Sequence, residues 1–304
     1  MSSPRTIAVT GSTGLLGEAL VAHLQGRGDD VRRVVRSRER AVGNDIYWSP
    51  SDGEIDAEAF EGLDAVVHLA GSPIGPRLWT DSVKREIMES RSAGTGLLAT
   101  TLSRLVDPPR TFISQSAIGW YGEDRGDERL TESSDGPGDD YLAKVCEVWE
   151  DSAGPAQDDD RIRVCITRTG LVLSSDGGLL PLMALPFKLG VGGPLGSGDQ
   201  WMSWISIEDQ VRAWAFLLDH DGSSGVFNFT APAPVTNAEF SRALAEVLGR
   251  PSWLRVPKVI PPGNLGQMLE QTAFASQRVL PAALEEAGFE FRHRDVRSGL
   301  RSVL

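Results

Sequence analysis

Short apolar runs alternate with stretches of helical periodicity through the first half of the chain. The first run, at residues 7–10, is followed by Leu16, Leu20 and Leu24, which share one face of a helix. The pattern predicts further strands at 31–35, 65–71, 111–114 and 164–167, helices at 97–105 and 141–152, and a polar loop between 114 and 141. Alternating strands and helices form crossover units, which build a parallel sheet covered on both faces. We therefore predict an α/β fold with a Rossmann-type doubly wound parallel sheet.

The pattern changes near residue 169, where glycine and proline begin to cluster. Residues 177–181 and 190–198 carry these clusters, which are typical of loops. A helix is predicted to start near residue 235, with Thr236 or Asn237 as its N-cap, and a last helix covers 281–287 before Gly288. No low-complexity linker separates the halves. We therefore expect residues 1–168 to form the doubly wound domain and 169–304 a smaller α+β C-terminal lobe that is interleaved with it.

The composition narrows the classes of partner. Thirty Lys and Arg residues against 42 Asp and Glu residues give a formal net charge of −12, which argues against a general nucleic-acid or membrane-surface binder. No apolar run approaches the roughly 20 residues that span a bilayer. The first strand also begins too early to leave room for a signal peptide. We expect a cytoplasmic monomer or homodimer that binds a small-molecule substrate, and neither nucleic acid nor membrane.

Cysteines and histidines show no metal-ligand spacing. The two cysteines, Cys146 and Cys165, lie far apart and predict reduced, structural thiols. The four histidines are scattered as well. We expect no metal site.

Three glycines at three-residue spacing follow the first strand. Gly11 permits a tight turn, Gly14 lacks the Cβ that would hold a pyrophosphate away, and Gly17 allows close helix packing. Phosphates would then bind the unpaired N–H groups at the helix N-terminus, so the segment predicts a dinucleotide clamp. The alternative is a glycine-rich turn without a ligand. The predicted cofactor contacts in this segment are Gly11, Ser12, Thr13, Gly14, Leu15, Leu16 and Gly17.

The end of the second strand indicates which dinucleotide is bound. An NAD-preferring enzyme usually carries Asp or Glu there, to accept hydrogen bonds from the ribose 2′-hydroxyl. This chain instead runs Val35, Arg36, Ser37, and Arg36 offers a planar, charge-assisted fork to a 2′-phosphate. The predicted cofactor is therefore NADP. Alternatively, Arg36 is a solvated surface residue.

Two further strand ends supply candidate contacts. Leu69, Ala70 and Gly71 end the third predicted strand, where small residues would let the adenosine side of the cofactor approach. Simple strand termination explains them equally well. Arg168 ends a later strand and would bind the cofactor or a substrate anion, unless it forms a buried ion pair.

A helical segment after Trp79 carries the last candidate cofactor contacts. Arg91 would reach a phosphate or ribose, and Glu86 an adenine or ribose edge. A surface ion pair between Glu86 and neighbouring Lys84 or Arg85 is the alternative.

Motifs along nearly the whole chain together resemble the extended short-chain dehydrogenase/reductase superfamily. Within it, the chain is similar to a small NAD(P)-dependent epimerase-like family of unsettled substrate. The resemblance implies an NADP-binding Rossmann domain over 1–168 and a C-terminal lobe closing over a substrate that is often nucleotide-sugar-like. The segments that carry it are Thr10 to Gly17, His68 to Gly71, Trp79 with Ser90 and Arg91, Ser116 to Gly122, Arg168 to Gly170, Gly192 to Gly198, Ser203 to Ile205, Asn237 to Phe240 and Gln277 to Pro281.

Relatives that transfer hydride use a Tyr, a Lys four residues later that lowers the Tyr pKa, and a Ser or Thr. This chain offers Tyr141 and Lys144, which are only three residues apart but share one helix face. If Glu150 instead takes the place of the acidic residue that relatives often carry, Leu142 and Cys146 fall at the Tyr and Lys positions. The usual dyad is then absent.

Ser116 and Tyr121 are the other catalytic candidates. Ser116 follows a strand at the sheet edge where open α/β folds bind ligands, and it would hold a substrate oxygen. A satisfied strand-end hydroxyl is the alternative. Tyr121 would be a substitute acid/base or a stacking wall, or else a packed loop aromatic.

The predicted function is that of an NADP-dependent oxidoreductase or epimerase-like enzyme that acts by hydride transfer on a polar small molecule, for which a nucleotide-sugar-like compound is one candidate. The alternative is an NADPH-binding regulatory or sensor protein with little or no turnover. The spacing of Tyr141 and Lys144 favours this second hypothesis.

Overall fold

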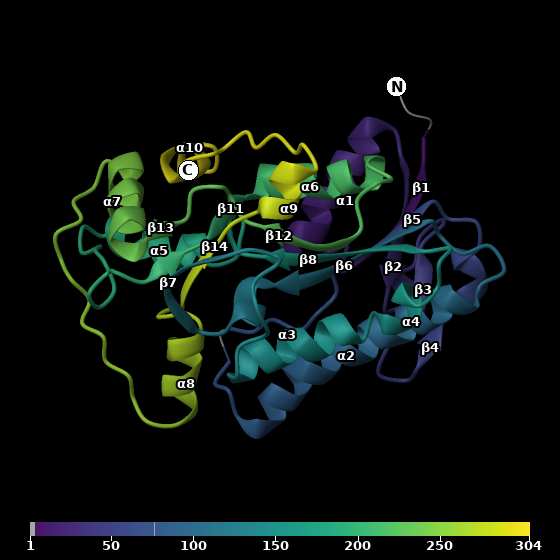
Figure 1. Ribbon diagram of the computed structural model, residues 1–304, viewed down its shortest axis with the longest axis horizontal. Helices are drawn as coiled ribbons and strands as arrows, with labels where there is room; N and C mark the ends of the chain where they lie inside the picture. The colour runs from purple at the N-terminus through teal and green to yellow at the C-terminus, as the bar shows by residue number, and fades with distance from the viewer. Residues whose placement is uncertain (1–3, 76) are drawn as a thin grey trace. The chain divides into compact units, whose positions relative to one another are not determined.

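The computed structural model describes residues 4–75 and 77–304, which belong to two compact units (Figure 1). The first unit comprises Met1–Ser116, Val145–Thr167 and Trp214–Val226, and the second comprises Ala117–Lys144, Arg168–Ala213 and Phe227–Leu304. The chain therefore crosses between the units repeatedly. One crossing falls at the expected boundary near residue 168, and the others have no signal in the hydrophobic pattern.

An eight-stranded sheet confirms the predicted Rossmann-type fold. Its strand order is β12-β8-β6-β5-β1-β2-β3-β4, so β1 lies between β2 and β5 where the winding reverses. The pairings along β3-β2-β1-β5-β6 are all parallel, and β4 joins β3 as an antiparallel edge strand. The strands are β1 (Thr6–Thr10), β2 (Asp30–Val35), β3 (Ile46–Ser49), β4 (Glu54–Ile55), β5 (Ala65–His68), β6 (Thr111–Ala117), β8 (Arg163–Thr169) and β12 (Gly225–Phe229).

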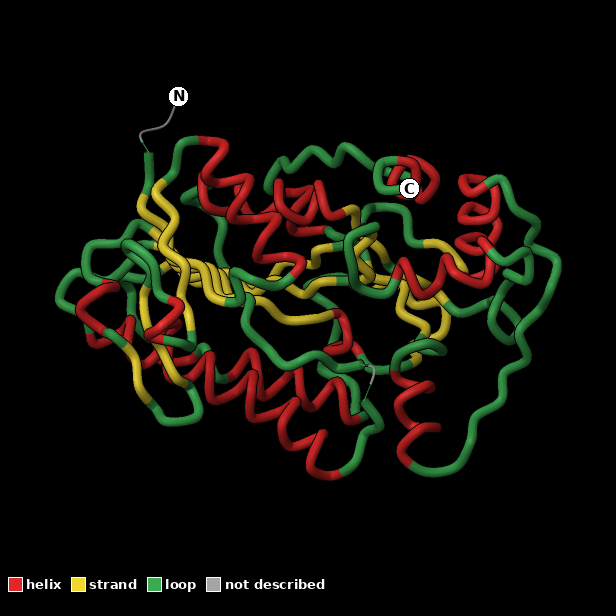
Figure 2. The backbone as a smooth tube through the Cα atoms, turned by 180° about the vertical axis from the view of Figure 1, so that it is seen from behind, coloured by secondary structure: helices red, strands yellow, loops and turns green. Residues whose placement is uncertain are grey.

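Helices cover both faces of this sheet within the first unit (Figures 1 and 2). They are α1 (Leu15–Arg27), α2 (Asp81–Arg104), the end of α3 (Tyr141–Asp151), α4 (Gly154–Gln157) and the end of α6 (Ile207–Asp219), with short turns η1 (Arg38–Arg40) and η2 (Ala57–Phe60). The predicted start of the helix at residue 97 is wrong, because α2 begins at Asp81, after its N-cap Thr80. Its first turns are charged and largely exposed, so they lack the apolar periodicity that marks its second half.

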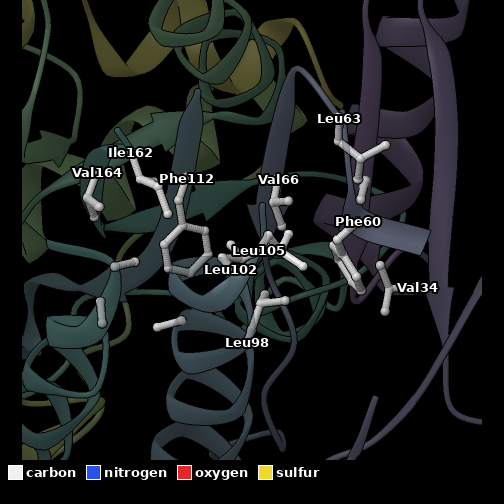
Figure 3. Packing of buried hydrophobic residues seen from close by; sticks show 14 of the residues in the cluster. Val34, Phe60, Leu63, Val66, Leu98, Leu102, Leu105, Phe112, Ile162 and Val164 are labelled. Carbon is white, nitrogen blue, oxygen red and sulfur yellow. The ribbon is translucent and has the colours of Figure 1, made fainter. Parts of the chain in front are cut away.

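The core of the first unit forms where α2 packs on the sheet (Figure 3). Leu98, Leu102 and Leu105 lie at helical spacing and face Val66 of β5 and Phe112 of β6. All five side chains are buried. Burying a Leu or Phe side chain contributes about 1.5–3 kcal/mol, so this contact fixes the two strands whose carboxyl ends carry candidate site residues.

The second unit is built from short strands and helices, as expected for an α+β lobe. Its paired strands are β7 (Asp124–Leu130) with β14 (Ser276–Val279), β9 (Leu171–Leu173) with β11 (Trp204–Ser206), and β10 (Trp201–Met202) with β13 (Val235–Thr236). Its helical elements are η3 (Ile118–Tyr121), α5 (Leu180–Lys188), α7 (Asn237–Leu248), α8 (Asn264–Gln271), α9 (Ala282–Glu286) and α10 (Val296–Arg301), together with the starts of α3 and α6. β7 lies inside the predicted polar loop, because most of its side chains face solvent and it shows no alternation.

The start of α7 confirms a predicted cap. Thr236 accepts a hydrogen bond from the Glu239 N–H, and the Glu239 carboxylate accepts one from the Thr236 N–H, which completes a capping box. Asn237, the other candidate, is the first helical residue. Its Oδ1 accepts a hydrogen bond from the Leu195 N–H at 2.8 Å, which ties the glycine-rich loop to α7.

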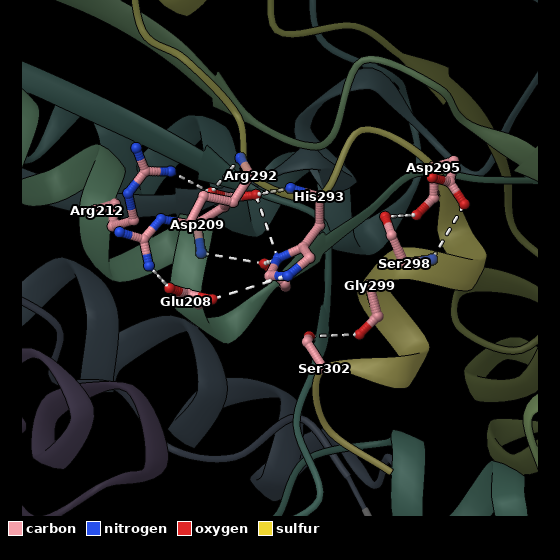
Figure 4. A network of polar contacts seen from close by, with 10 residues as sticks. Glu208, Asp209, Arg212, Arg292, His293, Asp295, Ser298, Gly299 and Ser302 are labelled. Atoms are coloured by element: carbon pink, nitrogen blue, oxygen red, sulfur yellow. Dashed lines mark hydrogen bonds and ion pairs between the residues drawn. The ribbon is translucent and has the colours of Figure 1, made fainter.

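A buried carboxylate fastens the C-terminal part of the second unit to α6, and we call this contact the Asp209 clasp (Figure 4). The fully buried Asp209 accepts hydrogen bonds from the N–H groups of Arg292 at 3.0 Å and His293 at 2.9 Å. The Arg212 guanidinium donates a third at 2.6 Å. Ser206 Oγ lies 2.9 Å from His293 Nδ1 and accepts the Asp209 N–H. One side chain thus holds two consecutive backbone amides far along the chain.

Candidate active site

The glycine turn presents a helix N-terminus without a side-chain cap. Gly11 has φ +64°, and the Gly14 N–H donates to the Gly11 carbonyl at 3.0 Å, which closes the turn. α1 starts after Gly14, and the Glu18 N–H donates to the Gly14 carbonyl at 2.8 Å. The amides of the first helical turn have no acceptor within the helix and are available to an anion. The segment therefore fits a dinucleotide pyrophosphate.

The three glycines have distinct reasons to lack a side chain. A Cβ on Gly17 would lie 2.1 Å from the Gly11 carbonyl oxygen, so the turn and α1 touch there. A Cβ on Gly11 would lie 2.8 Å from the Leu69 carbonyl carbon. A Cβ on Gly14 would meet only the Gly11 oxygen, at 3.4 Å, which is an ordinary contact. Protein packing thus requires Gly11 and Gly17 to lack a side chain, whereas the protein itself leaves room for a Cβ at Gly14, and its role toward a ligand stays a prediction.

Hydrogen bonds from Thr10 hold the end of β5 beside this turn. Thr10 Oγ1 accepts from the N–H groups of Leu69 at 3.0 Å and Ala70 at 3.2 Å, so its own hydrogen is directed to His68 Nδ1 at 2.7 Å. His68 Nε2 then carries the ring hydrogen and donates to Thr95 Oγ1 at 3.0 Å. The network requires a neutral His68. Burial agrees, because it lowers the pKa of His68 to about 4.

Acidification is expected to weaken the fold through His68. Because the folded protein keeps this ring neutral, the unfolded chain, with a His pKa near 6.5, binds the proton first as the pH falls. The stability that His68 contributes is complete above about pH 6.5, declines below it and is lost below about pH 4, a change of about 3 kcal/mol. Urea unfolding between about pH 7 and pH 5 should show a shallower loss for His68→Gln than for wild type. Parallel losses would contradict the prediction, and the exposed His220→Gln variant serves as control.

Arg36, at the end of β2, has an exposed guanidinium. Arg36 is exposed and makes no hydrogen bond or ion pair with any residue that the structure describes. By contrast, the Arg38 guanidinium lies 3.7 Å from the centroid of the Tyr47 ring. Val35 is fixed in the sheet by its pairing with Tyr47, and Ser37 precedes η1 without bonding to it. Arg36 is therefore free to meet an anionic group.

Glu86 and Arg91 are engaged within the first unit. Glu86 forms a two-bond ion pair with Arg77, at 2.8 Å for both bonds, and those hydrogen bonds lower its pKa. This is the predicted alternative, with Arg77 in place of Lys84 or Arg85. Arg91 is buried, donates to the carbonyls of Ser72 at 3.0 Å and Ile87 at 3.1 Å, and lies beside Gly71. Arg91 thus supports the chain after β5, and direct contact with a cofactor stays a prediction for both residues.

Ser116 lies at the carboxyl end of β6 and is buried. β6 pairs with β5, which pairs with β1, so Ser116 and the glycine turn are at the same edge of one parallel sheet. The Ser116 hydroxyl donates to Glu150 Oε1 near the end of α3 at 2.6 Å. The sequence indicates Glu150 only as the counterpart of an acidic residue in relatives, and not as a partner of Ser116. A contact across 34 residues leaves no local signal.

Tyr121 and Arg168 lie in a buried cluster of the second unit. The Tyr121 hydroxyl is 2.9 Å from both the Thr131 carbonyl and Asn228 Oδ1, and burial raises its pKa, which Arg168 opposes. The Arg168 guanidinium lies 3.5 Å from the centroid of the Trp120 ring. This geometry matches the packed-aromatic alternative for Tyr121. A catalytic role for Tyr121 and a cofactor role for Arg168 stay predictions.

The first turn of α3 holds the Tyr141 and Lys144 pair. Tyr141 is half-buried and Lys144 is exposed. Leu142 and Cys146, the residues of the alternative alignment, are both buried. The acid/base role of Tyr141 and Lys144 is thus untested by this geometry. Both cysteines are buried and neither forms a disulfide, as predicted.

Metal sites and membrane spans are two further features to consider in residues 4–75 and 77–304. No group of three His, Cys, Asp or Glu side chains there is arranged to hold a metal ion. Within the same ranges, no helix combines the length and apolar character that a membrane span requires.

Similarity to known proteins agrees with this geometry. A profile of the NAD dependent epimerase/dehydratase family matches residues 7–229. The chain belongs to this family. A second profile, a domain of unknown function named DUF1731, matches residues 256–303 and so covers the segment held by the Asp209 clasp. The resemblance indicated by the sequence motifs is thereby confirmed.

Three relatives match over nearly the whole of this chain. The chain is 39% identical over 299 residues to epimerase family protein ML0860 of Mycobacterium leprae, covering 98% of this chain and 95% of the relative. The human epimerase family protein SDR39U1, solved with NADPH, superposes with a TM-score of 0.88 at 29% identity and 98% coverage of both chains. A nucleoside-diphosphate sugar epimerase from Corynebacterium glutamicum is 38% identical with a TM-score of 0.78, covering 99% of this chain and 59% of that one. The protein thus has an NAD(P)-binding fold of the epimerase type.

Proposed function

We propose that this family member is an NADP(H)-dependent oxidoreductase or epimerase-like enzyme that acts on a polar small molecule. The observation that carries the proposal is Arg36, an exposed guanidinium without a partner among the described residues, at the strand end where NAD-preferring enzymes carry a carboxylate. The 2′-phosphate of NADP would meet a planar, charge-assisted donor there. The NADPH bound by human SDR39U1 supports the same choice.

Other residues of the first unit would bind the remaining parts of the cofactor and the substrate. The amides that open α1 would hold the pyrophosphate, and Gly14 would leave room for its approach. The end of β5, set by Thr10, would face the adenosine side. A bound nicotinamide supplies or accepts the hydride. Ser116, at the same sheet edge, would bond the reacting oxygen of the substrate. The sugar-nucleotide epimerase among the relatives supports a polar, nucleotide-sugar-like substrate.

Replacement of Arg36 tests the cofactor choice. Arg36→Ala is expected to raise the Kd for NADPH by about 10–100-fold, because a charge-assisted hydrogen bond contributes about 1.5–3 kcal/mol. The Kd for NADH, which lacks the 2′-phosphate, should stay unchanged. Fluorescence titration measures both. Arg110→Ala is the matched control, since it removes an exposed arginine just before the amino end of β6, at the opposite edge of the sheet. Equal NADPH affinity in the two variants would refute the assignment.

One observation favours a second candidate function, an NADPH-binding regulatory protein without efficient turnover. If Glu150 takes the place of the acidic residue that relatives often carry after the Lys, Leu142 and Cys146 fall at the usual Tyr and Lys positions, and both are buried. A panel of carbonyl compounds and sugar nucleotides separates the two hypotheses. NADPH oxidation or stereospecific isotope exchange supports the enzyme, whereas NADPH binding without turnover, together with a cofactor-dependent change in partner affinity, supports the sensor.

A further inference from the structure

The hydrogen bond between Ser116 and Glu150 has a chemical consequence for the substrate. A serine hydroxyl has one hydrogen and two lone pairs. In this structure the hydrogen is directed to Glu150 Oε1 at 2.6 Å, a length typical of a hydroxyl bonded to a carboxylate. Ser116 Oγ therefore has only its lone pairs left for a ligand. With Glu150 as a carboxylate, Ser116 is set to accept a hydrogen bond from an alcohol, and with Glu150 protonated its hydrogen is released for donation to a carbonyl.

The pair is shielded from solvent, more fully at Ser116 than at Glu150. Ser116 is 1% exposed at the end of β6, and Glu150 is half-buried on α3. The other charged residues of α3 are Lys144, Glu147 and Asp151. From α2, the Arg91 guanidinium lies 4.9 Å from the centroid of the adjacent Trp149 ring. Both members of the pair belong to the first unit, which also contains the glycine turn.

We propose that Glu150 is a positioning residue that takes the substrate's hydroxyl proton through Ser116. This proposal rests on the proposed function. When an alcohol is oxidised, its O–H proton passes to Ser116 Oγ while the Ser116 proton passes to Glu150, and the C–H bonding pair leaves as hydride to the oxidised nicotinamide. The alcohol becomes a carbonyl, and Glu150 ends protonated. Reduction of a carbonyl reverses each transfer. Ser116 and Glu150 would thus transfer the proton that Tyr and Lys transfer in relatives.

The hydrogen bond is tested without turnover, by carbon-13 NMR of protein labelled at glutamate side-chain carboxyls. The Glu150 resonance is identified by its loss in Glu150→Gln. It is expected to move in Ser116→Ala, which removes the donor, both with and without NADP⁺. Ser114→Ala is the matched control, because Ser114 lies on the same strand, is buried, and has a hydroxyl without a hydrogen-bond partner. The Glu150 resonance should stay in place in that control.

Turnover is measured with NADPH and 2,3-butanedione as the carbonyl probe. Glu150→Gln is expected to lower kcat by about 10²–10⁴-fold, the usual contribution of a positioned proton donor, while KM and the Kd for NADPH change less than about threefold. The pH-dependent limb of kcat should persist in Glu150→Asp and disappear in Glu150→Gln. Asp151→Asn makes the same charge change at the neighbouring, exposed position and should leave kcat intact.

The outcomes separate this proposal from the proposed function. A Glu150→Gln variant that keeps both kcat and the pH-dependent limb overturns the role of Glu150 alone. If wild type binds NADPH but does not reduce the probe, the carbon-13 shift decides: a resonance that moves in Ser116→Ala supports the pair, and an unmoved one overturns it. A wild-type protein that binds no NADPH overturns both proposals.

Discussion

Gly17→Ala is expected to destabilise the protein by about 3 kcal/mol and to abolish measurable NADPH binding. The added Cβ would lie 2.1 Å from the Gly11 carbonyl oxygen and 2.8 Å from both the Gly11 carbonyl carbon and the Ser12 Cα. All three atoms are backbone, so no side chain can rotate away. α1 must then move off the turn, and the amides that open the helix move with it. Urea unfolding and fluorescence titration with NADPH measure the two effects.

Two other glycines of the same region provide matched controls. Gly26→Ala makes the same change in α1 with nothing within 4 Å of the new Cβ, so it should leave NADPH affinity unchanged and stabilise the helix by up to about 1 kcal/mol. Gly14→Ala should leave stability within about 1 kcal/mol of wild type and weaken NADPH binding, because its Cβ fits the protein but occupies the ligand side. A stable, NADPH-binding Gly17→Ala variant would show that the contact of turn and helix is dispensable.

Asp209→Ala is expected to lower the free energy of unfolding by about 3–5 kcal/mol. The carboxylate is fully buried and accepts hydrogen bonds from the N–H groups of Arg292 and His293 and from Arg212. Its removal leaves two amides without acceptors and a guanidinium without its counter-ion. Equilibrium unfolding measures the loss. Limited proteolysis near Arg292 should show the release of the C-terminal segment.

The neighbouring residue gives the control for the clasp. Glu208 pairs with Arg292 and lies 3.8 Å from His293 Nε2, but both Glu208 and Arg292 are substantially exposed. Exposed ion pairs contribute at most about 1 kcal/mol, so Glu208→Gln should unfold close to wild type. If Glu208→Gln and Asp209→Ala lose equal stability, the two amides bonded to Asp209 are not what holds the segment.

Local patterns predicted the sheet and the cofactor clamp. Strands 111–114 and 164–167 are short, mostly buried runs, as expected where both faces of a parallel sheet are covered, whereas 31–35 is recognised by its β-branched valines around two arginines. Where the burial pattern is not periodic, prediction failed. β7 exposes nearly all its side chains and is held by main-chain bonds to β14, and the first half of α2 is charged and largely exposed. Neither β7 nor the first half of α2 therefore shows a hydrophobic periodicity in the sequence.

The candidate site divides in the same way. The glycine turn and Arg36 could be proposed from the sequence because the residues of each motif are consecutive or directly follow one strand. The partners of Ser116, Tyr121 and Arg91 are not, since Glu150, Asn228 and the Ser72 carbonyl are joined to them by the tertiary fold alone. The sequence therefore indicates which polar side chains are candidates for function. It does not show which of them already use their hydrogen-bonding groups within the protein.

The repeated crossing of the chain between its two units constrains how the protein is made. The first unit needs the segment Trp214–Val226 as its last contribution, so it is incomplete until most of the chain has been synthesised. A fragment ending at residue 168 would lack β12, a strand of the main sheet, and the end of α6. Neither unit can be released by a single cut. Until β12 emerges, β8 therefore lacks its neighbour at that edge of the sheet.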